Sequence, residues 1–384
     1  MLLVIEPNKL GMEHLTFNAA LLRALARAPR RGRMVFMSER VHCEQIKRLL
    51  GPDGCEFEWR EVEVVSGLER RFVRKFLAEC LAVWKALAFA RRERGRVLVL
   101  SLLANVLPFT IIFSRLFKRV PLHVILHGEL ESLLIPEKRT VTREGFWVEL
   151  ALLRLFDGVR PHLYVLGKGI RERLLERFPD ARWLCAIRAI EHPYSFGPSP
   201  SGSGPGRVFL RVGFVGAASA SKGAIEFFRL AKALSTYVAE GRLQFVIVGG
   251  LDRDCAAESN ECVEVLAERA GGLDVQGFRS GIAGLDVALF VYRRDYRFTA
   301  SGTVFDVINE GVEILSLTNE YLMDVARDDV EGGMKFFDSL EAIAEELRKR
   351  AETGARRIRF EYPRIKKTHS DDVASALAAT VMSS

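Results

Sequence analysis

Residues 212–234 consist of three short pieces with different patterns, VGFVG, AASASKG and AIEFFRLAKAL. The first is an apolar run ending in glycine, which predicts a buried strand that enters a turn. Small residues and one lysine follow as far as Gly223, and Ala224–Leu234 then repeats its apolar positions with the period of a helix. A strand, a loop and a helix in this order predict a parallel sheet covered by helices.

The same unit repeats toward the carboxyl end of the chain. Apolar runs predict further strands at 245–250, 287–291, 314–317 and 336–337, and helical patterns lie at 263–270, 303–309 and 340–350. This alternation is typical of an α/β domain.

The amino-terminal half has a similar organisation. Leu2–Ile5 predicts a strand, and a helix follows the loop from Glu6 to Gly11. Further strands are predicted at 34–37, 97–100, 124–126 and 163–166, with helical patterns between them. Crossovers between such strands build a Rossmann-like sheet.

A run rich in glycine, serine and proline at 196–206 divides the two halves and indicates a flexible linker. We therefore predict an α/β protein with a Rossmann-like domain at 1–195, a linker at 196–207 and a second Rossmann-like domain at 208–365. An Ala-rich segment at 373–381 predicts a final helix, and we expect residues 366–384 to pack back on the first domain.

The composition is that of an ordinary globular protein. The chain has 384 residues, of which 49% are apolar and 27% charged, so a disordered or collagen-like protein is excluded. Six scattered cysteines form no C-x-x-C pair, which predicts neither a zinc site nor a disulfide framework and fits a reducing cytoplasm. The opening residues MLLVIEP lack the features of a secretory leader and predict a first strand.

Residues 97–114 carry no charge over 18 positions, which is long enough to suggest a membrane span. Asn105 favours a turn inside this run, and Pro108 suits the first turn of a new helix. We therefore expect a short strand followed by a helix, with the membrane span as the alternative.

Charge is divided unevenly along the chain. The formal net charge of +7 combines +11 in residues 1–200 with −4 in residues 201–384. A basic domain indicates an anionic partner such as membrane lipid, nucleic acid or a phosphorylated acceptor. No nucleic-acid-binding motif accompanies the charge, so we expect no nucleic-acid partner; a surface rich in solvated arginine is the alternative.

Parallel sheets bind ligands beyond the carboxyl ends of their strands, so the loops there are candidate sites. Gly216–Gly223 follows the first strand of the second half, and its small residues would let backbone amides and the ammonium of Lys222 approach a phosphate. A plain turn is the alternative. The D-x-D pair at 252–254 has no evident third ligand, so we expect a surface loop there and no metal.

The loop after the predicted strand 287–291 is a second candidate. Ser301 is suited to cap a helix, which would turn the N–H groups of Gly302 and Thr303 toward a phosphate. Arg294 would add positive charge, and Asp306 could accept hydrogen bonds from a ribose. Alternatively, Asp306 is only a favourable acid in a first helical turn.

The second half resembles the nucleotide-sugar domain of GT-B type glycosyltransferases, particularly bacterial polysaccharide and glycolipid enzymes. The segments that carry this likeness are 212–223, 245–250, 276–278, 285–290 and 301–317. The resemblance implies a GT-B fold, in which two Rossmann-like domains have parallel sheets facing a central cleft. It also implies that Lys222 and the turn Ser301–Thr303 hold the donor diphosphate, and that Asp306 replaces a ribose-binding glutamate. Phe298 departs from the pattern, because that group has an acid there.

In such enzymes the first domain binds the acceptor, so the loops after its strands are implied to supply a base. A histidine or carboxylate at a strand end can take the proton from an acceptor hydroxyl near neutral pH. The candidates are Glu13, His14, His127 and Glu129. Purely structural histidines are the alternative. His192 and Tyr194, just before the linker, are expected at the interdomain cleft.

Residues 66–96 combine nine arginines and lysines with bulky apolar side chains. This composition predicts a basic amphipathic helix suited to an anionic membrane surface. A helix buried within the domain is the alternative.

Together these features predict a cytoplasmic glycosyltransferase, peripheral on the inner face of the plasma membrane. It would move a sugar from a UDP- or GDP-sugar donor to a glycan or lipid-linked acceptor in bacterial polysaccharide or glycolipid synthesis. We expect no metal and no cofactor besides the donor. The alternatives are a sugar-nucleotide epimerase and a non-catalytic binding or scaffold protein, both of the same fold.

Overall fold

The computed structural model describes residues 1–28, 32–65, 72–134, 143–197, 209–267, 273–292, 297–354, 358–370 and 374–383. Contacts divide the chain into two units. The first comprises Met1–Ser195, Phe298–Ala300 and His369–Ser384, and the second comprises Phe196–Arg297 and Ser301–Thr368. Most of the predicted linker, from 198 onward, lies outside the described residues.

The first unit is built on a seven-stranded parallel sheet in the order β3-β2-β1-β4-β5-β6-β7. Its strands are β1 (Leu2–Ile5), β2 (Met34–Ser38), β3 (Phe57–Glu61), β4 (Arg96–Val99), β5 (Leu122–Leu126), β6 (His162–Leu166) and β7 (Arg188–Ile190). Strand β1 lies inside the sheet and all four of its residues are buried, which explains its uninterrupted apolar run. The order of these strands is that of a Rossmann-like sheet, as predicted.

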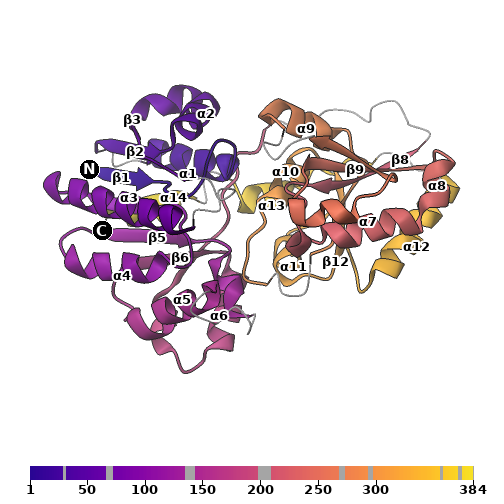
Figure 1. Ribbon diagram of the computed structural model, residues 1–384. Helices are drawn as coiled ribbons and strands as arrows, with labels where there is room; N and C mark the ends of the chain where they lie inside the picture. The colour runs from indigo at the N-terminus through magenta and orange to yellow at the C-terminus, as the bar shows by residue number, and fades with distance from the viewer. Residues whose placement is uncertain are drawn as a thin grey trace. The chain divides into compact units, whose positions relative to one another are not determined.

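Helices cover both faces of this sheet (Figure 1). They are α1 (Leu15–Arg27), α2 (Arg40–Leu50), α3 (Phe72–Arg92), α4 (Leu107–Leu116), α5 (Glu144–Glu149), α6 (Lys168–Arg177) and α14 (Ala374–Ser383). The last helix, α14, packs against α1, and the guanidinium of Arg96 donates a hydrogen bond to the carbonyl oxygen of Val381 at 2.7 Å. The first unit therefore contains segments from both ends of the sequence.

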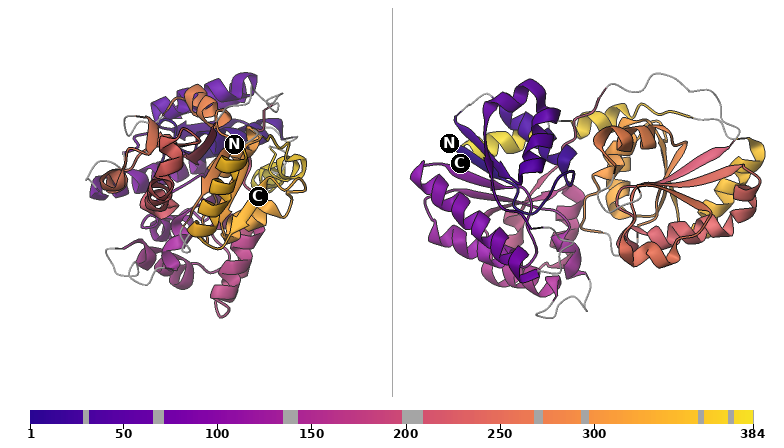
Figure 2. Two further views of the ribbon diagram at one scale, coloured as in Figure 1. Left: turned by 90° about the vertical axis from the view of Figure 1, so that its right-hand side faces the viewer. Right: turned by 45° about the horizontal axis from the view of Figure 1, so that its top comes forward.

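The second unit has a six-stranded parallel sheet in the order β10-β9-β8-β11-β12-β13, again with helices on both faces (Figure 2). The strands are β8 (Leu210–Val215), β9 (Leu243–Gly250), β10 (Val263–Ala267), β11 (Val287–Phe290), β12 (Glu313–Leu317) and β13 (Met334–Phe337). The helices are α7 (Ala224–Ala233), α8 (Ser235–Ala239), α9 (Val275–Ala283), α10 (Thr303–Asn309), α11 (Glu320–Ala326), α12 (Leu340–Thr353) and α13 (Pro363–Thr368). In its core the ring of Phe227 packs edge-on against Phe214 and Phe245, each with centroids 5.6 Å apart.

The uncharged run at 97–114 forms strand β4 and helix α4, which confirms the prediction of a strand followed by a helix. Across the described ranges, no helix is both long and apolar enough to cross a membrane.

The helix predicted at 263–270 is wrong. Val263–Ala267 is strand β10, which pairs in parallel with β9, while 268–270 lie outside the described residues. Two β-branched residues at alternate positions, Val263 and Val265, favour a pleated edge strand, and pairing with β9 outweighs the helical spacing of the sequence.

Candidate functional site

The loop after β8 packs against the start of α10 at the carboxyl edge of the second sheet. Gly216 directly follows β8 and has a φ of +97°, a conformation that L side chains rarely adopt. A Cβ added there would lie 2.9 Å from Cγ2 of Thr303 and 3.9 Å from Nζ of Lys222. The missing side chain of Gly216 therefore lets a hydroxyl-bearing residue and an ammonium group approach the same backbone.

Gly223 fixes the place of Lys222. It has a φ of +83°, and a Cβ there would stand only 2.0 Å from the carbonyl oxygen of Val291. Lys222 is half-buried and ends a short helical turn, Ala220–Lys222, that Gly223 joins to α7. The close packing of Gly223 on the residue after β11 thus places the lysine at the sheet edge.

Much of the backbone of the loop after β8 is already hydrogen-bonded. The N–H groups of Gly216 and Ala218 donate to the carbonyl oxygens of Val248 and Gly250 at 2.9 and 2.8 Å. These bonds tie the loop to β9, but they occupy amides that the sequence analysis assigned to a phosphate. Lys222 is the one cationic side chain of residues 216–223.

Ser301 does not cap a helix, which corrects the prediction. Helix α10 begins at Thr303 with Gly302 at its N-cap and no side-chain capping bond. The buried hydroxyl of Ser301 instead lies 2.6 Å from the hydroxyl of Tyr292 and 3.0 Å from Oγ1 of Thr303. Burial raises the pKa of Tyr292 to about 12, so this chain of three hydroxyls stays neutral and orients Thr303.

Asp306 and Arg294 are the other donor-site candidates. Asp306 is half-buried in the first turn of α10, one turn beyond Thr303. Arg294 falls within 293–296, outside the described residues, whereas Arg297 forms an ion pair with Glu320 at 2.7 Å. Within the described part of the chain, no group of three or more His, Cys, Asp or Glu side chains is placed to hold a metal ion.

In the first unit, three of the predicted residues gather around Phe17 on α1. The rings of His14 and His127 have centroids 4.6 Å apart, and the ring of Phe17 packs edge-on against His127 and His192 at 4.9 and 5.0 Å. These residues follow three different segments, β1, β5 and β7, whose carboxyl ends meet at one edge of the sheet. The sequence analysis named His14 and His127 as candidate bases and expected His192 at the interdomain cleft; the structure brings the three rings together around Phe17.

The histidines of this cluster are neutral near neutral pH. Burial lowers the pKa values of His127 and His192 to about 3 and that of His14 well below its ordinary value. Nε2 of His127 lies 2.8 Å from the carbonyl oxygen of Leu100, so Nε2 carries the proton and Nδ1 keeps its lone pair. Nδ1 of His14 is buried and has no hydrogen-bond partner among the described atoms.

The acidic candidates differ in their surroundings. The carboxylate of Glu129 accepts a hydrogen bond from the N–H of His127 at 2.6 Å, and burial raises its pKa to about 7. Glu13 is exposed and accepts from the N–H of Leu10 at 3.3 Å, so it supports the turn before His14. Tyr194 is buried, and its N–H donates to the carbonyl oxygen of His369.

A buried network that the sequence analysis missed supports the loop leading to His14. The carboxylate of Glu6 accepts hydrogen bonds from the N–H of Asn8, from Nδ2 of Asn18 and from Oγ of Ser101, at 3.1, 3.2 and 2.5 Å. Nδ2 of Asn18 also lies 2.9 Å from Nε2 of His42. Both Glu6 and Ser101 directly follow the apolar runs of β1 and β4, and that position was the signal available in the sequence.

No protein-family model matches the chain, and no curated protein sequence matches it. Solved structures do match over nearly the whole length. HepE from Anabaena, in complex with UDP and glucose, is 15% identical with a TM-score of 0.63, over 100% of this chain and 99% of HepE. WaaG, a glycosyltransferase involved in lipopolysaccharide biosynthesis, is 15% identical with a TM-score of 0.58, over 99% and 95%. A putative UDP-N-acetylglucosamine 2-epimerase from Listeria monocytogenes is 12% identical with a TM-score of 0.54, over 100% and 95%. These similarities confirm the predicted GT-B fold.

Proposed function

We propose that the protein is a glycosyltransferase that moves a sugar from a nucleotide diphosphate donor to an acceptor hydroxyl. The observation that carries the proposal is the packing of Lys222 and Thr303 around the bare backbone of Gly216. The shared fold supports it, because HepE was solved with UDP and glucose and WaaG is a glycosyltransferase.

The second unit would hold the donor. Lys222 would neutralise the diphosphate, which gains charge as the bond to the sugar breaks, and the hydroxyl of Thr303 would donate a hydrogen bond to it. Arg294 would add positive charge, and Asp306 would accept hydrogen bonds from the ribose. Since a lysine supplies the positive charge in this arrangement, we propose that the donor binds without a metal.

The first unit would accept the proton of the attacking hydroxyl. Nδ1 of His14 is the atom we assign to this step, because it is neutral, buried and without a partner among the described atoms. His127 packs against the ring of His14, and Glu129 holds the turn that carries His127.

The acceptor would be a glycan or a lipid-linked sugar of bacterial polysaccharide or glycolipid synthesis. The excess of positive charge in residues 1–200 supports an anionic partner, and peripheral contact with the inner face of the plasma membrane would bring the enzyme to such an acceptor.

Nucleotide binding tests this proposal directly. Calorimetry with UDP, GDP, ADP and CMP, each with and without EDTA, should reveal selective binding of UDP or GDP that survives EDTA. Binding of none of the four would leave a non-catalytic protein of the same fold. The fold is shared with a putative epimerase, so products must be analysed with and without acceptor. Conversion of the nucleotide sugar without acceptor would favour an epimerase.

A further inference from the structure

Helix α3 has a stripe of large apolar side chains that face solvent. Val73, Leu77, Leu81 and Trp84 are 66, 57, 50 and 39% exposed. Their spacing of four, four and three residues puts them on one side of the helix, opposite the buried Ala82, Val83, Ala86 and Leu87. On a soluble protein, the outward side of a surface helix is ordinarily polar or charged. The outward side of α3 instead exposes a contiguous apolar stripe.

Helix α4 extends this apolar surface. Ile112 and Leu116, one turn apart on α4, are 39 and 61% exposed. Aromatic contacts join the two helices, because the ring of Trp84 packs edge-on against Phe113 and Phe117 at 5.2 and 4.9 Å. We call this surface of α3 and α4 the apolar face.

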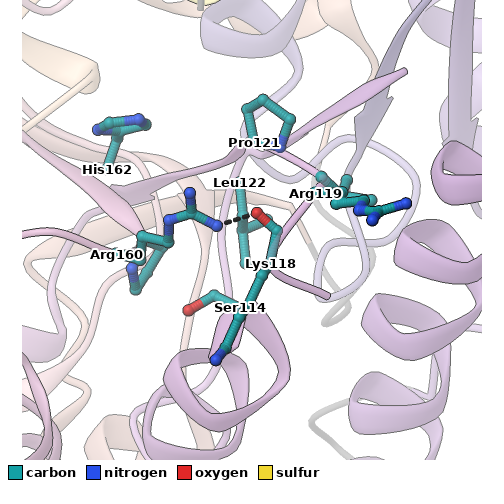
Figure 3. A pocket seen from close by; sticks show the side chains of 9 residues that line it. Ser114, Lys118, Arg119, Pro121, Leu122, Arg160 and His162 are labelled. Carbon is teal, nitrogen blue, oxygen red and sulfur yellow. Dashed lines mark hydrogen bonds between the residues drawn. The ribbon is translucent and has the colours of Figure 1, made fainter. Parts of the chain in front are cut away.

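A basic pocket of about 430 Å³ adjoins the end of α4 (Figure 3). Three cationic residues line it, Lys118 and Arg119 just after Leu116, and Arg160 just before β6. The guanidinium of Arg160 donates a hydrogen bond to the carbonyl oxygen of Lys118, which holds the two segments together (Figure 3). Of the nine described residues around the pocket, none is acidic.

Ser114 and His162 complete the polar part of the lining. Burial and nearby arginines lower the pKa of His162, so its ring is a neutral hydrogen-bonding group near neutral pH. The nearest acid along the chain, Asp157, does not line the pocket. Its carboxylate accepts from the N–H groups of Val159 and Arg160 at 2.9 and 3.3 Å and pairs with Arg115 at 3.3 Å. The pocket therefore presents positive charge and hydrogen-bonding groups suited to a phosphate.

We propose that this pocket binds the phosphate of an anionic phospholipid while the apolar face inserts into the same leaflet. Charge complementarity supports the assignment, because exposed Arg91 and Arg92 at the end of α3 lie just before β4, whose amino end is at the sheet edge that borders the pocket. The inference rests on the proposed function, because binding to a bilayer would bring the enzyme to a lipid-linked acceptor. The pocket lies at the edge of the first sheet opposite the edge that carries the histidine cluster.

Vesicle sedimentation of the full chain tests the inference. We expect binding to vesicles of phosphatidylcholine mixed with phosphatidylglycerol and much weaker binding to phosphatidylcholine alone. The pocket variant Lys118→Gln/Arg119→Gln/Arg160→Gln should bind the mixed vesicles about 100-fold more weakly, because each surface cation contributes about fivefold. Its matched control removes three exposed cations of the second unit, Arg229→Gln/Lys232→Gln/Lys349→Gln. An equal loss of vesicle affinity in both variants would overturn the assignment of the lipid phosphate to this pocket, since binding would then follow net charge alone.

The apolar face is tested in the same assay. Leu77→Gln/Leu81→Gln/Leu116→Gln should weaken binding at least tenfold, whereas Met323→Gln/Val330→Gln/Ile358→Gln, on exposed apolar residues of the second unit, should not. Unchanged binding of the first variant would overturn insertion. Calorimetric binding of soluble glycerol 3-phosphate as tight as vesicle binding would assign the pocket to a free phosphate compound.

Failure here can be told apart from failure of the proposed function. The pocket variant and the apolar-face variant should bind nucleotide as the wild type does, because their substitutions lie in the first unit and the donor residues belong to the second. A protein that binds nucleotide but ignores anionic vesicles at low salt overturns this inference alone. One that binds vesicles but no nucleotide overturns only the proposed function.

Discussion

Cγ2 of Thr303 lies so close to the backbone of Gly216 that a Cβ added to the glycine would stand 2.9 Å from it. Gly216 directly follows β8 and Thr303 begins α10, so two segments far apart in the sequence share one contact. The same glycine lies beside Lys222. The proposed donor site therefore depends on a packing contact as much as on its charged residue.

Replacement of Gly216 by alanine should destabilise the second unit by about 1–3 kcal/mol and weaken nucleotide binding, because it adds a clash to an unfavourable φ. Chemical denaturation and calorimetry measure the two effects. Gly241→Ala is the matched control, since Gly241 has a φ of +69° and nothing within 4 Å of an added Cβ. Adding Thr303→Ser to Gly216→Ala removes the clash alone and should recover part of the loss. Equal effects at both glycines would mean that the contact with Thr303 is unimportant.

Lys222→Ala should weaken binding of UDP or GDP by about 10- to 100-fold, because a charge-assisted hydrogen bond contributes about 1.5–3 kcal/mol. Lys222→Arg should retain part of the affinity. Lys232→Ala, an exposed lysine on α7, serves as the control in the same titration. Similar nucleotide affinities for the Lys222→Ala and Lys232→Ala variants would show that Lys222 does not bind the donor.

Ser301→Ala should cost about 1–3 kcal/mol of unfolding free energy, because it removes the buried hydroxyl that lies 2.6 Å from the hydroxyl of Tyr292 and 3.0 Å from that of Thr303. Tyr292→Phe should cost a similar amount, and the double variant should lose less than the sum of the two. Urea denaturation measures all three. Strictly additive losses would show that the two hydroxyls do not stabilise each other.

His14→Ala should lower the rate of sugar transfer by about 10²- to 10⁴-fold, the range in which a proton acceptor contributes. Nucleotide affinity, measured by calorimetry on the same sample, should not change. Because burial keeps His14 neutral, lowering the pH from 8 to about 6 should not remove activity by protonating it. A variant with wild-type turnover would exclude His14 as the proton acceptor.

Stability should fall as the pH rises, because the carboxyl group of Glu79 on α3 is buried. Burial raises its pKa from 4.5 to about 8, so between these values the folded protein holds a proton that the unfolded chain has released. The free energy of unfolding should therefore decrease between about pH 4.5 and pH 8, by up to about 5 kcal/mol. Glu79→Gln keeps an acceptor for the N–H of Leu103 and should remove this part of the slope. Parallel pH curves for the two proteins would contradict the assignment.

Apolar runs predicted most of both sheets because strands buried on two faces must be apolar throughout. The sequence pattern did not distinguish a strand from a helix where the strand is buried on only one face. In β10, Glu264 is exposed between Val263 and Val265, and the short edge strand was mistaken for a helix.

The candidate sites were partly predictable for a similar reason. Lys222 and His127 could be predicted because both lie in loops that follow strands. In a parallel sheet the carboxyl ends of the strands share one edge, where ligands bind. The role of Ser301 was missed, since its partner Tyr292 is nine residues away across a loop. The network around Glu6 joins residues as distant as Ser101, and such pairing follows from the folded sheet rather than from local spacing.

The position of α14 has a consequence for how the chain is made. The ribosome synthesises the second unit before it synthesises α14, which packs on α1 in the first unit. Nascent chains generally fold from the amino end, but here the first unit is incomplete until α14 has been translated. We expect the second unit to complete its structure first, and the earliest-made half to need protection in the meantime.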